Sequence, residues 1–231
     1  MRRSFSEQDA AFSSAERAVQ VRPRRSTVKR LEVRDVSLQT VRPLIERNHY
    51  THSTPAAASR AFGVYLGRRL EGAAVLTPGA RNAHRILVAA EPEDVITLSR
   101  LWLSDRLPKN AESRVLGVVI RTLRREGRHK ALVTFADPAV GHDGTIYRAA
   151  GFRYLGRTEP ESTLIIDGRE RHPRSAWDDY GSNNIGHLRR TGVRVFRVRT
   201  EPKHRYVAVL DRAWGWRLGA LSEKAHNALG P

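Results

Sequence analysis

Apolar and polar residues alternate from residue 31 to residue 37, and strand-like runs return at 61–67, 70–78 and 95–104. A two-residue period places one face of a strand against a core, so these runs predict four strands. Arg68 and Arg69 separate the second run from the third, which favours a hairpin. Apolar or aromatic-rich runs at 130–137, 152–158 and 205–211 predict three further strands.

Helical spacing separates these strands. Residues 38–50 and 145–151 favour helices, and residues 108–127 favour a longer one with Val115, Val119 and Leu123 on one face. Asn110 is the expected N-cap and Gly127 the expected end. The order predicts an α+β fold in three layers, with a mixed, mostly antiparallel central sheet flanked by helices.

The organisation along the chain follows from composition. Residues 1–28 are polar and basic and predict a flexible arm or, equally, a leader without function. Residues 29–212 are expected to form a single catalytic domain with a basic insertion at about 159–204, and residues 213–231 a C-terminal tail. No internal repeat is present in the sequence.

The net charge is the strongest indication of the kind of partner that the protein binds. The net charge is +17, which favours a polyanionic partner such as nucleic acid, although a solvated arginine-rich surface would also produce it. The absence of cysteine excludes disulfides, thiolate zinc sites and a cysteine nucleophile. No apolar run reaches the roughly 18 residues that span a bilayer, and the first 20 residues do not resemble a signal peptide. We therefore expect a cytoplasmic protein without a membrane partner.

Three segments carry a resemblance to a known family. They are Asn48-His49-Tyr50, residues 98–113 and residues 134–158, the last containing ADPAVGHDGTIY. Together they resemble the phage Mom family, within the GNAT N-acyltransferase-like superfamily, over about residues 31–210. The resemblance implies a transferase that converts adenine in DNA to an N6-carbamoylmethyl form and so protects phage DNA from restriction. It also implies that Tyr147 stands where many acyltransferases keep a general acid.

The donor of the transferred group stays open. Ordinary acyltransferases of this superfamily hold the pyrophosphate of coenzyme A on a glycine-rich turn and a helix N-terminus. Here the corresponding turn, DRLPKNAES, has no glycine before Gly117, although Lys109 could bind an anion. An acyl-CoA and an aminoacyl-tRNA both remain candidates, and simple acyl transfer would not form the bond to a CH2CONH2 group.

Five residues are candidates for catalysis. Asp137 could accept the N6 proton or, alternatively, close a turn before Pro138, and Tyr147 could protonate a leaving group or pack its helix. Arg100 interrupts an apolar run and would need an anionic partner if buried. Strand alternation places it on the opposite face from Leu101, so it could instead be an exposed arginine of the strand. Ser113 could bind substrate or satisfy the helix start, and His49 could act as a base.

Other residues are candidates for binding. Substrate-binding candidates are Tyr50, Tyr65, Asn110 and His142, with Tyr65 equally suited to the core. His49, His52 and Asp137 could in principle form a two-histidine, one-carboxylate site for iron or another metal, although their spacing matches no established metal signature.

The insertion mixes basic clusters with Trp177, Tyr180 and Phe196, which suits phosphate contacts and base stacking, whereas a solvated surface is the simpler interpretation. The candidate DNA-binding residues are Arg24, Arg25, Arg189, Arg190, Lys203 and Arg205. The expected partner is double-stranded DNA with a flipped adenine, and tRNA or coenzyme A is a possible donor. An ordinary N-acyltransferase acting on a protein or small amine, and a non-catalytic DNA-binding protein, are the alternative functions.

Overall fold

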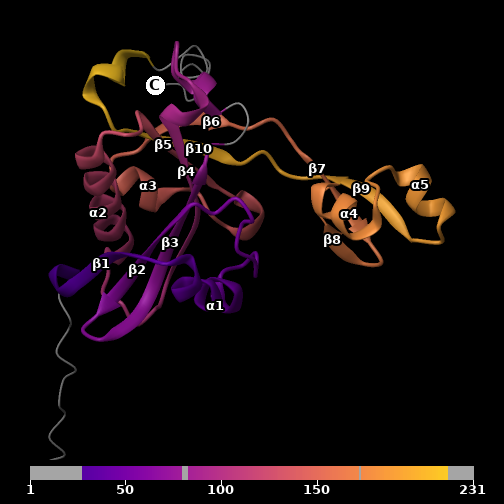
Figure 1. Cartoon of the computed structure of the whole chain (residues 1–231), viewed down its shortest axis with the longest axis horizontal. Coiled ribbons are helices and arrows are strands. Elements are labelled where there is room, and N and C mark those ends of the chain that lie inside the picture. The colour runs from indigo at the N-terminus through magenta and orange to yellow at the C-terminus, as the bar shows by residue number, and fades with distance from the viewer. Residues whose placement is uncertain (1–27, 80–82, 172, 218–231) are drawn as a thin grey trace, which may run out of the picture.

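The computed structural model describes residues 28–79, 83–171 and 173–217, and it contains two β-sheets with associated helices (Figure 1). The larger sheet has seven strands: β1 (Leu31–Val36), β2 (Arg60–Leu66), β3 (Arg69–Pro78), β4 (Val95–Leu103), β5 (Ala131–Ala136), β6 (Arg153–Arg157) and β10 (His204–Val209). All seven strands expected from the sequence therefore form, with ends shifted by one or two residues.

The strand order in this sheet is β1-β2-β3-β4-β5-β10-β6. Each neighbouring pair is antiparallel except β4 and β5, which are parallel. The mixed, mostly antiparallel α+β fold is thus confirmed. The one parallel pair needs a crossover, and α2 (Ala111–Glu126) supplies it.

Helices cover both faces of the sheet and give three layers (Figure 1). On one face α2 and α3 (Thr145–Ala149) contribute to a core with Phe62, Leu98 and Leu132. On the other face α1 (Leu38–Asn48) packs Val41 and Ile45 against alternate strand residues such as Ala61. Buried residues thus alternate between the two faces along β2, because successive side chains of a strand point to opposite sides.

The two ends of α2 behave differently from one another. Gly127 ends the helix with a φ of +66°, and its N–H donates to the Leu123 carbonyl, as the sequence predicts. Asn110 does occupy the N-cap position, but it adopts a left-handed φ of +69° and its side chain makes no capping hydrogen bond. The expected side-chain cap is therefore wrong, and the Ala111 N–H instead donates to the Pro108 carbonyl at 3.1 Å.

A β-bulge interrupts the pairing of β3 with β4. Val75 pairs with Arg100 while its neighbour Leu76 pairs with Leu98, so Ser99 is the extra residue. A bulge re-aims the side chains around it and often lies next to a functional site. The simple alternation that the sequence suggested for Arg100 is therefore broken at this point.

The segment between β6 and β10 builds a small unit of its own, which extends away from the larger sheet in Figure 1. It consists of β7 (Ser162–Ile166), β8 (Arg169–Arg171), β9 (Val195–Arg199), α4 (Pro173–Tyr180) and α5 (Ile185–Arg190). The three strands form a separate sheet, and Leu164, Ile166 and Leu188 are among its separate core. The long basic insertion thus has a hydrophobic core, which its mostly polar sequence does not predict.

Helices long and apolar enough to cross a membrane are absent from the described residues.

Candidate active site

The parallel strands β4 and β5 separate before they end. They pair from Val95 to Leu98 on one strand and from Ala131 to Thr134 on the other, whereas β4 continues to Leu103. The unpaired part of β4 leaves a gap in the sheet that side chains from other elements surround. A cavity of about 470 Å³ lies there, within the usual range for a small-molecule site.

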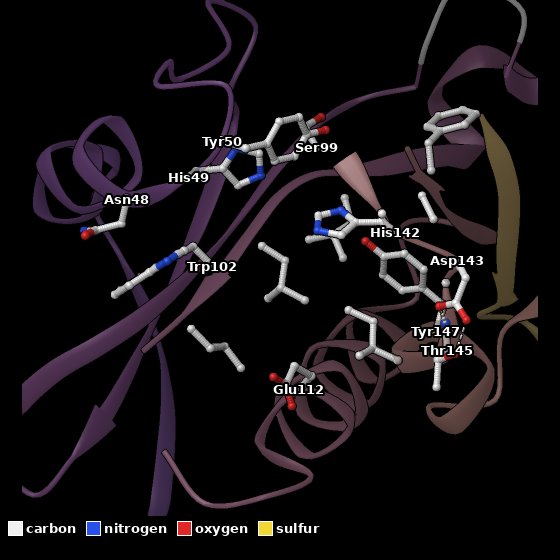
Figure 2. Close-up of a pocket in the computed structure, with 18 of the residues that line it drawn as sticks. Asn48, His49, Tyr50, Ser99, Trp102, Glu112, His142, Asp143, Thr145 and Tyr147 are labelled. Carbon is white, nitrogen blue, oxygen red and sulfur yellow. Dashed lines mark hydrogen bonds between the residues drawn. The ribbon is translucent and has the colours of Figure 1, made fainter. Parts of the chain in front are cut away.

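Five segments line this cavity, which we call the large cavity (Figure 2), and one of them is the last two residues of β5. Strand β4 contributes its last residues, including Trp102, and the end of α1 contributes Asn48, His49 and Tyr50. The first turn of α2 contributes Glu112, and the loop and helix at 141–147 complete the wall. The three motifs on which the sequence resemblance rests therefore meet at one place.

His49 is buried, with 6% of its surface exposed, and lines the large cavity. Its Nδ1 accepts a hydrogen bond from the Thr51 backbone N–H at 3.2 Å. Burial, together with the nearby positive charge of Arg100, lowers the pKa of His49 to about 4. The imidazole is therefore neutral near pH 7, and its Nε2 carries the proton and acts as a hydrogen-bond donor.

Tyr50 is 44% exposed and lies at the rim of the large cavity. The edge of its ring meets the ring of His142 at 5.6 Å between centroids, and its other neighbour is His49 at 4.4 Å. These three rings bring together residues that are more than 90 positions apart in the sequence. An accessible aromatic face beside a cavity is suited to stacking on a planar ligand.

Tyr147 projects from α3 and is 9% exposed, with its ring against Phe152 and Tyr206. Burial raises the pKa of its hydroxyl, and the Thr134 side chain opposes this in part by hydrogen bonding. Tyr147 lines the large cavity, so its protonated phenol borders that space (Figure 2). This position and protonation state are those that a proton donor requires.

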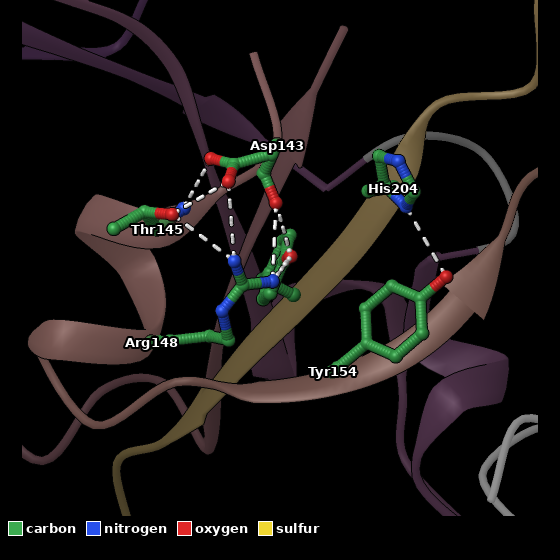
Figure 3. A network of polar contacts seen from close by, with 6 residues as sticks. Asp143, Thr145, Arg148, Tyr154 and His204 are labelled. Carbon is green, nitrogen blue, oxygen red and sulfur yellow. Dashed lines mark hydrogen bonds and ion pairs between the residues drawn. The ribbon is translucent and has the colours of Figure 1, made fainter. Parts of the chain in front are cut away.

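The loop before α3 is held by a polar network (Figure 3). The Asp143 carboxylate accepts hydrogen bonds from the Thr145 N–H at 2.8 Å and hydroxyl at 2.7 Å, which lowers its pKa. Tyr206 donates to the Asp143 carbonyl at 2.7 Å, and Arg148 donates to Tyr206 at 2.8 Å. Strand β10 and helix α3 thus fix the loop that carries His142 into the cavity wall.

The charge of the large cavity is opposite to that of the whole chain. Its walls include the carboxylates of Asp105, Glu112 and Asp143, and none of the described residues that line it is lysine or arginine. Glu112 lies in the first turn of α2, at the positive end of the helix dipole. A carboxylate there repels an anion from the helix N-terminus.

A second cavity of about 260 Å³, which we call the small cavity, adjoins the first and shares Tyr50, Leu98 and Phe135 with it. Arg100 and Lys203 line it. The structure thus brings two predicted residues with separate expected roles, one catalytic and one DNA-binding, to a single place. The half-buried Arg100 thus borders a cavity, although it stands in an otherwise apolar strand.

Asp137 lies directly after β5 but outside the lining of both cavities. Its Oδ1 accepts a hydrogen bond from the Ala139 N–H at 3.1 Å, and its Oδ2 lies 3.4 Å from the Lys203 Nζ. The turn-closing interpretation of this aspartate therefore describes its present contacts. Burial raises the pKa of Tyr50 at the rim, and the negative charge of Asp137 adds to that effect, so Asp137 lies near the rim.

Other predicted residues lie away from the cavities. Ser113 donates to the Asn110 carbonyl at 3.1 Å, and neither lines a cavity. Tyr65 lies under the Arg34 guanidinium on β2, 4.8 Å from its ring centre. Arg189 and Arg190 are exposed on α5, Arg205 is half-buried on β10, and Arg24 and Arg25 lie outside the described residues.

His52 points elsewhere, with its Nδ1 3.1 Å from the Glu46 carbonyl. Within the described part of the chain, no group of three or more histidine, aspartate or glutamate side chains is arranged to hold a metal ion. The set of His49, His52 and Asp137 is therefore not assembled as ligands in this structure.

Several residues of the site were not singled out from the sequence. Trp102, Asp105 and Glu112 all fall within the motif at residues 98–113, and Asp143 and Thr145 within the motif at 134–158. Their nearness to the motifs was a usable signal, but their direction depends on where β4 separates from β5. That geometry has no local sequence pattern.

Comparison with known proteins identifies the family. The model of the Mom protein family matches residues 30–226. This chain belongs to the Mom protein family. The methylcarbamoylase mom of Escherichia phage Mu is similar to it, with 29% identity over 150 residues that cover 62% of this chain and 61% of the relative. Less than two thirds of that Mom-family relative is therefore matched, and the resemblance seen in the three sequence motifs is confirmed.

Solved structures with a similar chain path are acetyltransferases. An aminoglycoside acetyltransferase bound to paromomycin and acetyl-CoA has a TM-score of 0.49 at 11% identity, covering 81% of this Mom-family chain and 96% of its own. The ribosomal-protein-S5-alanine acetyltransferase of Vibrio fischeri has a TM-score of 0.48 at 12% identity, covering 80% and 95%.

Proposed function

We propose that this Mom-family chain is a DNA-modifying transferase that converts adenine to an N6-carbamoylmethyl derivative. The observation that carries the proposal is the large cavity, where the Tyr147 phenol and the neutral His49 imidazole face one space. The name of the phage Mu relative, a methylcarbamoylase, supports the same chemistry. The net charge of +17 supports a nucleic acid as the acceptor.

Access to the adenine amine requires the base to leave the duplex. The N6 atom is paired inside the helix, so an enzyme that alters it extrudes the nucleotide into a pocket. The large cavity has a volume suited to a base together with a small donor group. The exposed ring of Tyr50 at its rim is placed to stack on the entering base.

The transfer forms a bond between N6 and the methylene carbon of a carbamoylmethyl donor and breaks the bond from that carbon to its leaving group. The N6 proton passes to a base, and the leaving group takes a proton in return. Tyr147 supplies that proton, and the His49 Nε2–H donates a hydrogen bond to the amide oxygen of the donor. The carboxylates of Asp137 and Glu112 are the two candidates for the base.

The charge of the large cavity limits which part of the donor can enter it. The carboxylates of Asp105 and Glu112 disfavour the pyrophosphate of coenzyme A inside the large cavity. We propose that only the uncharged, transferable end of the donor enters there. The transfer step requires a donor whose methylene carbon carries the leaving group. An acyl-CoA thioester or an aminoacyl-tRNA carries its leaving group on a carbonyl carbon, so either would have to be converted to such a carbamoylmethyl donor first, with its phosphates outside the large cavity.

The DNA duplex is proposed to lie across the small unit and the cavity rim. Trp177 and Phe196 are 57% and 52% exposed in that unit, which is rich in arginine, including Arg189 and Arg190. Exposed aromatic and basic side chains together suit contact with bases and phosphates. Arg24 and Arg25 would add phosphate contacts.

The proposal is tested by challenging plasmid DNA with restriction enzymes whose sites contain adenine. Plasmid from cells that express the chain is expected to resist cleavage, because a substituted N6 blocks the major-groove contacts of those enzymes. Plasmid from cells that express Tyr147→Phe is expected to be cut. Equal cleavage of both plasmids, with both proteins folded and abundant, would contradict the proposal.

A further inference from the structure

The small cavity is lined by positively charged and hydroxyl side chains that have no part in the reaction proposed for the large cavity. Arg100 and Lys203 supply two cations, and Thr77, Thr97 and Ser99 supply three hydroxyl groups. None of the described residues that line it is aspartate or glutamate. The Asp137 Oδ2, just outside the lining, lies 3.4 Å from the Lys203 Nζ, so this carboxylate partly neutralises one of the two cations. The remaining attraction for an anion comes mainly from Arg100 and the hydroxyl groups.

Arg100 lacks the anionic partner that a half-buried guanidinium ordinarily has. Its Nε donates to the Ser53 carbonyl at 3.0 Å and its Nη1 to the Ser99 carbonyl at 2.8 Å, and no carboxylate of the described residues forms an ion pair with it. Burial accordingly lowers its pKa. These carbonyl contacts orient the guanidinium while they leave its positive charge unneutralised.

Thr97 gives a second, independent observation. It is 6% exposed and lines the small cavity, and its Oγ1 has no hydrogen-bond partner among the described residues. The neighbouring hydroxyls of Thr77 and Ser99 satisfy one another at 2.6 Å. A buried hydroxyl without a partner costs stability unless a ligand completes it, so Thr97 points to an occupant.

We infer that the small cavity is a phosphate-binding subsite, in which the Arg100 guanidinium, Lys203 ammonium and Thr97 hydroxyl hold one phosphate group of a nucleotide. The inference rests on the proposed function, since the nucleotide is the one whose reactive part enters the adjoining large cavity. The two cavities share Tyr50 and Phe135, so a single nucleotide can place its phosphate in one and its base in the other.

The phosphate has two possible sources, the acceptor DNA strand and a donor nucleotide. Binding of five probes to the full-length chain separates them: 2′-deoxyadenosine, its 5′-monophosphate, its 3′-monophosphate, coenzyme A and the trinucleotide CCA. The affinities are measured by calorimetry for the parent protein, Arg100→Gln and Thr97→Val. Arg125→Gln is the matched control, because Arg125 is exposed near the far end of α2.

If the phosphate belongs to the acceptor strand, a monophosphate binds roughly tenfold more tightly than the nucleoside. Arg100→Gln is expected to abolish that advantage and Thr97→Val to reduce it, while Arg125→Gln keeps it. If the phosphate belongs to the donor, the acceptor monophosphates show no advantage, and coenzyme A or CCA loses affinity in the same two variants. Both results support the phosphate subsite and differ only in its occupant.

Thr97→Val keeps the test decisive even if Arg100→Gln does not fold, because the removed hydroxyl has no partner in the described protein. The inference is overturned if neither the monophosphates nor coenzyme A and CCA bind better than deoxyadenosine, or if Arg100→Gln and Thr97→Val leave the binding of all four phosphate-bearing probes unchanged. The plasmid test of the proposed function is separate from this one. If the plasmid is cleaved but the phosphate preference is intact, the proposed function is wrong and the phosphate subsite stands. If the plasmid resists cleavage but the phosphate preference is missing, the proposed function stands and the subsite is wrong.

Discussion

Gly144 lies so close to Tyr206 that a Cβ atom at position 144 would overlap the tyrosine ring. The contact joins the loop of the large cavity to strand β10, which is more than 50 residues further along the chain. Gly144 also has a φ of +77°, a conformation that side chains with a Cβ rarely adopt. The loop that carries His142 therefore depends on a glycine for two separate reasons.

This relationship predicts different results for two glycines of the same loop. Gly141 has a φ of +75°, but a Cβ atom there would meet no atom within 4 Å, so Gly141→Ala should cost roughly 1 to 2 kcal/mol from backbone strain. Gly144→Ala adds the overlap with Tyr206 and should cost about 1 to 3 kcal/mol more. Urea denaturation of the two variants measures the difference, and equal losses would refute the packing argument.

A second prediction concerns Arg60, which links three elements. Its Nε donates to Asp35 on β1 at 2.7 Å, and its terminal nitrogens donate to Glu126 on α2 at 2.5 and 2.7 Å. Arg60→Met should lower the free energy of unfolding by about 1 to 2 kcal/mol, since paired carboxylates lose a shared partner. Arg34→Met, which removes an exposed pair with Glu32 on β1, serves as the control and should change less.

The low pKa of His49 predicts a specific acid sensitivity. The folded value is about 4 and the ordinary value is 6.5, so protons bind the unfolded chain first as the pH falls. Above pH 6.5 the titration of His49 does not change the free energy of unfolding. As the pH falls from 6.5 to about 4, the buried neutral imidazole lowers the free energy of unfolding by roughly 3 kcal/mol in total. His49→Gln should therefore lose less stability between pH 7 and pH 4.5 than the parent protein in urea titrations. The same loss in both proteins would show that His49 is not a buried neutral imidazole.

The proton acceptor can be assigned by comparing two carboxylates. Glu112 lines the large cavity, whereas Asp137 is held by Ala139 and Lys203 beside the rim. Loss of a general base should lower the rate by about 100-fold or more, whereas loss of a carboxylate with another role should have a smaller effect. Modified-nucleoside formation by Glu112→Gln and Asp137→Asn measures this. Similar rates in both variants and the parent would exclude both residues as the base.

Most of the fold could be predicted from the sequence, because the two-residue period of a strand is visible in a short stretch of sequence. The strands and their order along the chain, and the helix at residues 111–126, follow from apolar spacing, and Gly127 ends that helix as expected. The side-chain cap at Asn110 failed because the backbone there is left-handed, which depends on how the turn from β4 packs. The insertion between β6 and β10 was expected at about residues 159–204, but its own sheet and core were not, because a few apolar residues such as Leu164 and Leu188 suffice for that core.

The candidate site was predicted unevenly for a similar reason. The motifs located His49, Tyr50, His142 and Tyr147, which the structure brings to one cavity. Glu112 was missed while its neighbour Ser113 was chosen, since the direction of a residue at a helix start depends on the cap geometry. The position of Arg100 depends on the bulge at Ser99. That bulge arises from the pairing of β4 with β3, and no local sequence pattern predicts it.

The central claim is that the large cavity modifies adenine in DNA, and mass spectrometry of nucleosides from cellular DNA tests it most directly. Cells expressing the parent chain, Tyr147→Phe or Tyr154→Phe are compared; Tyr154 contacts His204 outside the large cavity and is the matched control. The account predicts a deoxyadenosine heavier by a carbamoylmethyl group with the parent and Tyr154→Phe, and little or none with Tyr147→Phe. Unmodified deoxyadenosine in all three, with folded protein present, would contradict it.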